Sequence, residues 1–131
     1  MTAIAVVIVN YNTRDHLRTC LASVMAERPG QVIVVDNASS DGSVAMVRAE
    51  FPSVVLQANK RNVGYGVAAN QAIASLKAKY VLLLNADTLL NPGALKAMSC
   101  YLDFHPQAAI QPGGRFAVRA TQDGASRHGS N

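Results

Sequence analysis

The sequence of 131 residues has no tryptophan, only 5% aromatic and 15% charged residues, and two cysteines. It also lacks a long apolar run, because residues 4–9 (IAVVIV) fall far short of the roughly 20 residues that a transmembrane helix needs. The low charge and the 50% hydrophobic fraction exclude a disordered chain. Cys20 and Cys100 are too few and too far apart for a disulfide framework, so we expect reduced thiols and a cytoplasmic protein.

The length fits a single domain, and the net charge of +4 is only a weak attraction for anionic partners. Much of the excess lies near the C-terminus, where Arg115, Arg119 and Arg127 accompany one acid, Asp123. The basic residues form no dense stripe with interleaved aromatics, which argues against a nucleic-acid partner. A phosphorylated small molecule fits this charge better.

Short apolar runs alternate with amphipathic segments along the chain. Runs rich in leucine or β-branched residues predict strands at residues 4–9, 32–35, 54–57 and 80–84, with a fifth at 108–111. With helices between them, this order indicates an α/β fold, a Rossmann-like, open, mainly parallel sheet with helices on both faces. Residues 1–111 are the expected domain. Residues 112–131, rich in glycine and small polar residues, are expected to form a loop or flexible C-terminal tail.

The last expected helix has a recognisable start at Asn91-Pro92. Asparagine is a preferred N-cap residue, and proline is favoured at the first helical position. The sequence therefore predicts that this helix is capped by Asn91.

Polar residues follow the expected strands at their carboxyl ends, at residues 10–12, 36–37, 59–62 and 85–87. In an open parallel sheet, ligands bind beyond these ends, so we expect the four segments to share one edge and one site. Strand ends are also polar because they meet water and cap the next helix. That alternative stays open for each segment.

Four residues at this edge suit particular ligand groups. Asp87 follows a buried strand and suits a divalent cation, since Mg²⁺ typically takes one or two carboxylates and completes its shell with phosphate and water. Asp36 with Asn37 offers hydrogen-bonding groups for the edge of a nucleobase, and Tyr11 suits stacking on a base. The alternatives are that Asp36 and Asp87 cap turns and that Tyr11 covers the sheet edge.

Residues 64–69 (GYGVAA) fit the G-x-G-x-x-A fingerprint of dinucleotide-binding domains, and Asp87 follows after about 20 residues. The fingerprint should turn tightly out of its strand in the first β-α unit. Here the polar residues 58–63 come first, and the unit is the third. A small Rossmann dinucleotide-binding domain therefore remains as an alternative.

Four motifs together cover nearly all of residues 3–104. They are VVIVNYN at residues 6–12, VIVVDNASSDGS at 32–43, NVGYGVAANQAI at 62–73 and YVLLLNADT at 80–88. In order and spacing they resemble the nucleotide-sugar-binding half of the family 2 glycosyltransferases, which have the GT-A fold. The rhamnosyltransferase-like branch is most similar, because its members often have an asparagine in the DXD motif.

This resemblance implies five nucleotide-binding residues. Tyr11 and Asn12 would lie beside the nucleotide, and Asp36 would hydrogen-bond the base. Asn62 and Gly64 would shape the loop over the ribose and diphosphate. The implied donor is a UDP-, dTDP- or GDP-sugar.

The resemblance also places Asn85 and Asp87 at the DXD position, where both face the sugar and diphosphate. Asn85 replaces the first aspartate, so it would hydrogen-bond sugar or ribose without adding charge. Asp87 would be the metal carboxylate for Mg²⁺ or Mn²⁺. The cation would offset the charge that grows on the leaving diphosphate.

Family members continue past the DXD strand into an acceptor-binding half with the Asp or Glu general base. Here the recognisable pattern ends near Gln111, and Asp123 lies in a turn-like QDG sequence with no partner, so no catalytic base is assigned. We therefore expect the donor domain of an inverting glycosyltransferase of polysaccharide biosynthesis, truncated or lacking the acceptor half.

One alternative is a nonenzymatic or degenerate GT-A module. Such a module would act by association with a partner chain or as a homodimer, through an exposed sheet edge.

Overall fold

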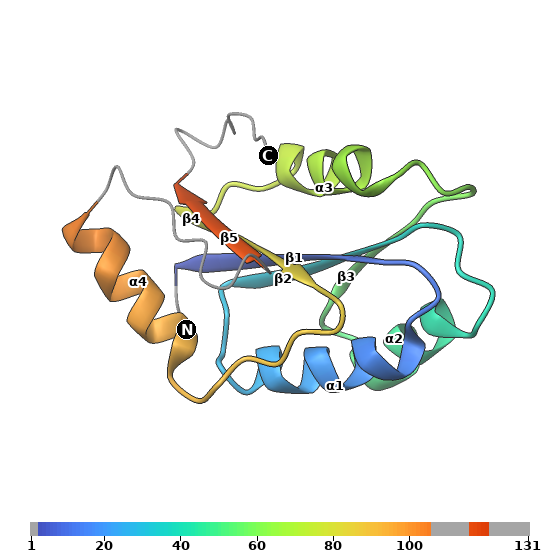
Figure 1. The fold of residues 1–131 in the computed structure, drawn as a ribbon, viewed down its shortest axis with the longest axis horizontal. Coiled ribbons are helices and arrows are strands. Elements are labelled where there is room, and N and C mark those ends of the chain that lie inside the picture. The colour runs from blue at the N-terminus through green and yellow to red at the C-terminus, as the bar shows by residue number, and fades with distance from the viewer. Residues whose placement is uncertain (1–2, 106–115, 121–131) are drawn as a thin grey trace.

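The computed structural model describes residues 3–105 and 116–120, which are built around one β-sheet (Figure 1). Its strands are β1 (Ile4–Asn10), β2 (Gln31–Asp36), β3 (Val55–Ala58), β4 (Tyr80–Asn85) and β5 (Phe116–Ala120). The helices are α1 (Arg14–Met25), α2 (Ser43–Glu50), α3 (Tyr65–Ala74) and α4 (Ala94–Phe104). The order of strands in the sheet is β3-β2-β1-β4-β5.

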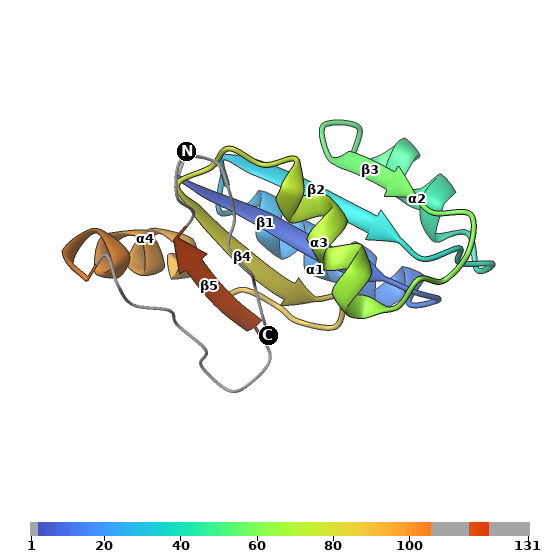
Figure 2. The same ribbon diagram turned by 90° about the horizontal axis from the view of Figure 1, so that it is seen from above.

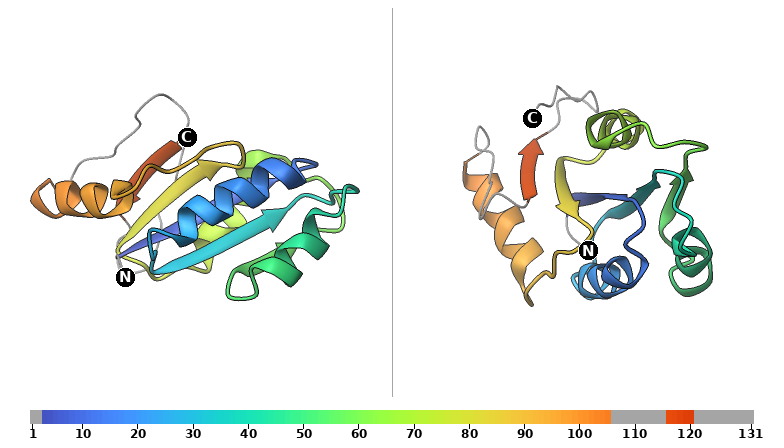
Figure 3. Two further views of the ribbon diagram at one scale, coloured as in Figure 1. Left: turned by 90° about the horizontal axis from the view of Figure 1, so that it is seen from below. Right: turned by 45° about the vertical axis from the view of Figure 1, so that its right-hand side comes forward.

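Strands β1 to β4 are parallel, and helices connect them. Helices α1 and α2 lie on one face of the sheet and α3 lies on the other (Figures 1 and 3). The α/β fold predicted from the sequence, with a mainly parallel sheet and helices on both faces, is therefore confirmed.

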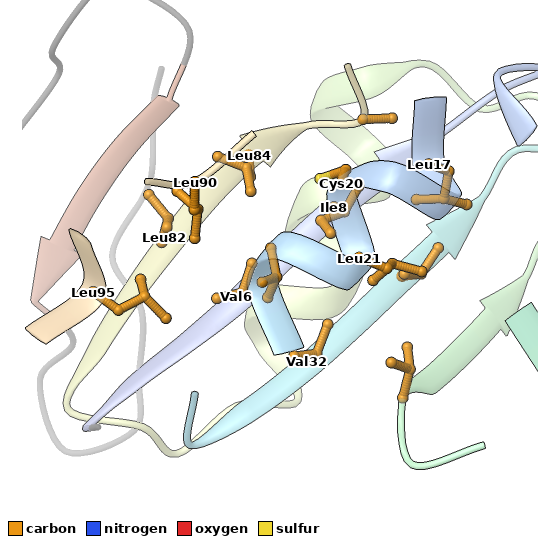
Figure 4. Close-up of a cluster of buried hydrophobic side chains, with 14 of the residues drawn as sticks. Val6, Ile8, Leu17, Cys20, Leu21, Val32, Leu82, Leu84, Leu90 and Leu95 are labelled. Atoms are coloured by element: carbon orange, nitrogen blue, oxygen red, sulfur yellow. The ribbon is translucent and has the colours of Figure 1, made fainter. Parts of the chain in front are cut away.

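Alternate residues of β1 divide the core into two layers, because successive side chains of a strand point to opposite faces. Ile4, Val6 and Ile8 belong to the larger cluster, which packs against α1, α2 and α4 (Figure 4). Ala5 and Val7 belong to the smaller cluster beneath α3. The continuous apolar run of β1 is thus explained by burial on both faces.

Strand β5 corrects part of the expectation for the C-terminal segment. Residues 116–120 fall within the expected loop or tail, yet they pair antiparallel with β4, with Ala120 opposite Tyr80 and Phe116 opposite Leu84. Without β5 this edge of β4 would expose unpaired backbone groups, which a strand from the same chain can satisfy. The strand predicted at residues 108–111 lies outside the described residues. The division at residue 111 stays a prediction.

Helix α4 begins at Ala94, so the predicted cap at Asn91 is wrong. The N-cap residue is Gly93, whose φ of 84° is a left-handed conformation that glycine adopts without strain. In residues 3–105 and 116–120, none of the helices has the length and apolar character needed to cross a membrane.

Candidate functional site at the carboxyl edge of the sheet

The loops after β1 to β4, residues 11–13, 37–42, 59–64 and 86–93, form what we call the carboxyl edge (Figure 2). Asn10 at the end of β1 is paired with Asp36 at the end of β2, and Val9 is paired with Asn85 at the end of β4. Helix α1 leads from β1 to β2 on one face, whereas α3 leads into β4 on the other. The strand order therefore reverses between β1 and β4, and ligands of open α/β sheets bind at such a point.

A buried hydrogen-bond network joins the ends of β1 and β2. Asp36 is 1% exposed, and its Oδ1 accepts hydrogen bonds from Asn10 Nδ2 at 2.9 Å and Ser39 Oγ at 2.7 Å. Its Oδ2 accepts one from the Ser39 backbone N–H at 2.8 Å. Asn10, fully buried, accepts a further bond from Thr13 Oγ1 at 2.6 Å. The Asp36 carboxylate thus holds the loop after β2, and its contact with a base stays a prediction.

The loops after β1 and β2 are also bonded to each other. The Asn12 N–H donates to Ser39 Oγ at 2.8 Å, and the Ser40 N–H donates to Asn12 Oδ1 at 2.8 Å. Asn12 itself has a φ of 52°, in the left-handed region. The Tyr11 side chain is 50% exposed at this position, which leaves its ring accessible to a ligand. The predicted neighbours Tyr11 and Asn12 therefore have different tasks, since only the Asn12 side chain binds the adjoining loop.

Asn37 connects β2 to the loop before α3, a role that the sequence analysis missed. It is 2% exposed, and its Nδ2 donates to the Gly64 carbonyl at 3.2 Å. Its Oδ1 accepts from Asn59 Nδ2 at 3.1 Å. In the same loop, Asn62 Oδ1 accepts the Gly64 N–H at 2.8 Å, and Gly64 has a φ of 87°. The asparagines of residues 59–62 were a visible signal, but their shared partner Asn37 was not.

The segment after β4 begins with a turn in which the Thr88 N–H donates to the Asn85 carbonyl at 3.0 Å. Asp87 is exposed in this turn. Cys20 of α1 lies beside it, and its Sγ donates to the Asn85 carbonyl at 3.8 Å. Burial, and next the nearby Asp87 charge, raise the pKa of Cys20 to about 12. Cys20 is therefore a neutral thiol at physiological pH and not a nucleophile.

The donor atoms at the turn fit a cation that brings its own phosphate ligands. Within residues 3–105 and 116–120, His, Cys, Asp and Glu form no group of three or more that could hold a metal ion. Asp87 offers an exposed carboxylate, and Thr88 Oγ1 is buried without a hydrogen-bond partner in the same turn. Mg²⁺ is commonly bound by one or two carboxylates together with substrate phosphates, so this sparse set suits it.

The sequence profile of "Glycosyl transferase family 2" matches residues 5–128. The chain belongs to this family. It is 34% identical over 106 residues to an N-acetylglucosaminyl-diphospho-decaprenol L-rhamnosyltransferase of Mycobacterium tuberculosis, covering 71% of this chain and 34% of that protein. It is 33% identical over 95 residues to the succinoglycan biosynthesis protein ExoO of Rhizobium meliloti, covering 70% of this chain and 27% of that protein. The chain thus spans about one quarter to one third of the length of these relatives.

Solved glycosyltransferases share the fold. S. aureus TarS residues 1–349 in complex with UDP superpose with a TM-score of 0.72 at 23% identity, covering 81% of this chain and 33% of that one. The mannosyltransferase PcManGT from Pyrobaculum calidifontis, in complex with GDP-Man and Mn²⁺, gives a TM-score of 0.69 at 21% identity, covering 91% and 44%. The GT-A fold is confirmed. Residues 64–69, the candidate dinucleotide fingerprint, lie within the part of the chain that this family profile matches.

Proposed function

We propose that this chain binds a nucleotide-diphospho-sugar together with Mg²⁺ or Mn²⁺ at the carboxyl edge, as the donor domain of an inverting glycosyltransferase. The observation that carries the proposal is the exposed carboxylate of Asp87 at the reversal point between β1 and β4, in a chain of this family. Structural neighbours described in complex with UDP, UDP-GlcNAc, and GDP-Man with Mn²⁺ support the ligand class.

Five residues are proposed to bind the nucleotide. The exposed Tyr11 ring stacks on the base. Asn12 and Asp36 shape the base site through the loop they bond, and Asp36 is proposed to hydrogen-bond the base. Asn62 and Gly64 lie over the ribose and diphosphate, where their mutual hydrogen bond sets the backbone.

Asn85 and Asp87 are proposed to face the sugar and the diphosphate. Asn85 at the end of β4 hydrogen-bonds sugar or ribose, and Asp87 binds the cation. A bound cation supplies Lewis-acid stabilisation of the leaving diphosphate. Because one carboxylate binds Mg²⁺ weakly by itself, metal and diphosphate should enter this site together.

A thermal-shift comparison of UDP, dTDP, GDP and NAD, each with and without Mn²⁺, tests the ligand class. At a concentration of ~100 Kd, a ligand that binds only the folded state stabilises it by about 2.7 kcal/mol. We expect a nucleoside diphosphate to stabilise the chain more strongly with Mn²⁺, and Asp87→Asn to remove that metal-dependent part. Asp103→Asn is the matched control, since this carboxylate is paired with Lys79 next to the opposite end of β4.

Two results would contradict the proposal. An absence of any nucleotide-dependent shift would refute nucleotide binding and leave a module that acts by association. A shift with NAD that is indifferent to Mn²⁺ would instead support the dinucleotide-binding alternative.

A further inference from the structure

Helix α1 and the turn that follows it contact the segment that carries Asp87. Cys20 and Ser23 lie three residues apart in the second half of α1, and Glu27 lies in the turn just after the helix ends at Met25. They reach residues 85–95 in sequence order. Cys20 Sγ donates to the Asn85 carbonyl at 3.8 Å, and Ser23 Oγ accepts a hydrogen bond from the Leu90 N–H at 3.1 Å. The Glu27 carboxylate accepts hydrogen bonds from the Gly93 and Leu95 N–H groups, each at 3.1 Å.

Glu27 supplies the cap that helix α4 lacks locally. The N-cap residue Gly93 has no side chain, and the first N–H groups of a helix have no partner within it. Oε2 of Glu27 accepts the Gly93 N–H, and Oε1 accepts the Leu95 N–H. A carboxylate at this end is also favoured by the positive pole of the helix dipole. The cap therefore comes from a residue 66 positions earlier in the chain.

Apolar packing holds the same segment against the sheet. Leu90 and Leu95 are 7% and 0% exposed, and both belong to the cluster that contains Cys20, Leu82 and Leu84 (Figure 4). Asp87 is exposed between the end of β4 and these buried leucines. The backbone on both sides of Asp87 is thus held, on one side by a strand and on the other by contacts with α1 and the turn after it.

The same helix begins at the other part of the site. Helix α1 starts at Arg14, two residues after Asn12, its second half carries Ser23, and Glu27 follows in the turn after its last residue. A rigid element therefore connects the proposed base-binding loop with the segment that bears the proposed metal carboxylate. A change at Glu27 would alter the placement of Asp87 without touching the nucleotide loop.

We propose that Glu27, assisted by Ser23, is a positioning residue that sets the Asp87 carboxylate for the metal-diphosphate group, and that α1 couples nucleotide binding to metal binding. This inference rests on the proposed function. The coupling between nucleotide and metal binding is assigned to the hydrogen-bond acceptors Glu27 and Ser23, which contact neither the nucleotide nor the metal in this proposal. Outer-shell partners of metal ligands act in this way by orienting the ligand.

The test uses Glu27→Ala, Glu27→Gln and Ser23→Ala, with Glu50→Gln as the matched control. Glu50 also pairs with α1, through Arg18 Nε at 2.9 Å, but this contact joins α1 to α2 and not to the Asp87 segment. Glu27→Gln keeps one acceptor oxygen and so should behave between the wild type and Glu27→Ala. It also keeps the test informative if Glu27→Ala fails to fold.

Two measurements are made on each variant. The first is amide hydrogen exchange at Leu90, Gly93 and Leu95. The second is the ratio of nucleotide Kd without and with Mn²⁺, measured by calorimetry with whichever of UDP, dTDP and GDP binds the wild type most tightly. We expect Glu27→Ala to lower protection of these amides about tenfold, the scale of one lost hydrogen bond. The Mn²⁺ ratio should fall about tenfold, with the metal-free Kd within twofold of the wild type.

The outcomes separate this inference from the proposed function. Faster exchange together with an unchanged Mn²⁺ ratio would make Glu27 merely structural and overturn the inference alone. Unchanged exchange at the three amides would overturn it as well, because the cap would then be dispensable. If the wild type binds none of the three nucleotides, the proposed function fails and this inference falls with it.

Discussion

At the scale of single residues, the carboxyl edge is held by polar side chains that bind the backbone of neighbouring loops. Asp36 bonds Asn10 and Ser39, and Asn37 bonds the Gly64 carbonyl. Asx-type contacts of this kind compete with regular structure and favour turns, which is why they occur where strands end. Tyr11 and Asp87, by contrast, are exposed. The edge thus separates residues that shape the loops from residues that face outward.

Asp36→Ala should lower the free energy of unfolding by about 3 kcal/mol, because it leaves the buried Asn10 amide and the Ser39 N–H without their acceptor. It should also weaken nucleotide binding while leaving the Mn²⁺ dependence unchanged, since the proposed metal carboxylate is Asp87. Urea unfolding and calorimetric titration measure the two effects. Asp15→Ala, which removes an exposed carboxylate, is the control. Unchanged nucleotide affinity in Asp36→Ala would remove Asp36 from the site.

The sequence alone predicted which residues gather at the edge but not how buried each one is. Asp36 and Asp87 both follow an apolar run, and the two are alike by that criterion. Asp36 is 1% exposed and accepts hydrogen bonds from Ser39 and Asn10. Asp87, in contrast, is exposed. Such long-range contacts depend on strand register, which local sequence patterns do not contain.

At the scale of secondary-structure elements, helix α3 packs on the sheet through small side chains. Ala68 and Ala72 are both fully buried against Ala5, Val7 and Ile33 of the smaller cluster. These small side chains let the helix backbone approach the strands closely. The packing of α3 in turn places Gly64 and the loop before it over the carboxyl edge.

Ala72→Leu should therefore destabilise the chain by about 2 kcal/mol, the usual cost of forcing extra methylenes into a packed interior. Ala74→Leu adds the same atoms to the same helix at an exposed position and should have little effect. Thermal unfolding of the two variants makes the comparison. Equal stability of both variants would contradict the close packing of α3.

The sequence predicted the alternation of strands and helices because each parallel strand is buried on both faces and is therefore continuously apolar. The start of α4 was not predicted, since its cap is Glu27 from the turn after a distant helix, whereas the sequence pointed to the nearby Asn91-Pro92 signal. It also missed β5, whose five residues FAVRA are short and adjoin a glycine-rich segment. Both misses arise from tertiary contacts that override local signals.

At the scale of the whole molecule, the strand order creates the site. The reversal between β1 and β4 brings Tyr11 and Asp87, which are 76 positions apart in the chain, to adjacent loops of one edge (Figure 2). The parallel strands also leave their carboxyl ends at one end of the sheet, which concentrates polar residues there. The family profile extends over residues 5–128, so it includes β5 as well as the parallel strands.

The central claim is that a nucleoside diphosphate and a divalent cation bind together at the carboxyl edge. Paramagnetic Mn²⁺ titrated into isotope-labelled protein, in the presence of the tightest-binding of UDP, dTDP and GDP, locates the cation by broadening nearby amide signals. Diamagnetic Mg²⁺ is the reference. The account predicts that the Asp87 and Tyr11 amides broaden most, only with nucleotide present, and that Asp87→Asn abolishes the effect. Broadening centred on Gly30 and Lys79 at the opposite edge, or broadening indifferent to nucleotide, would contradict it.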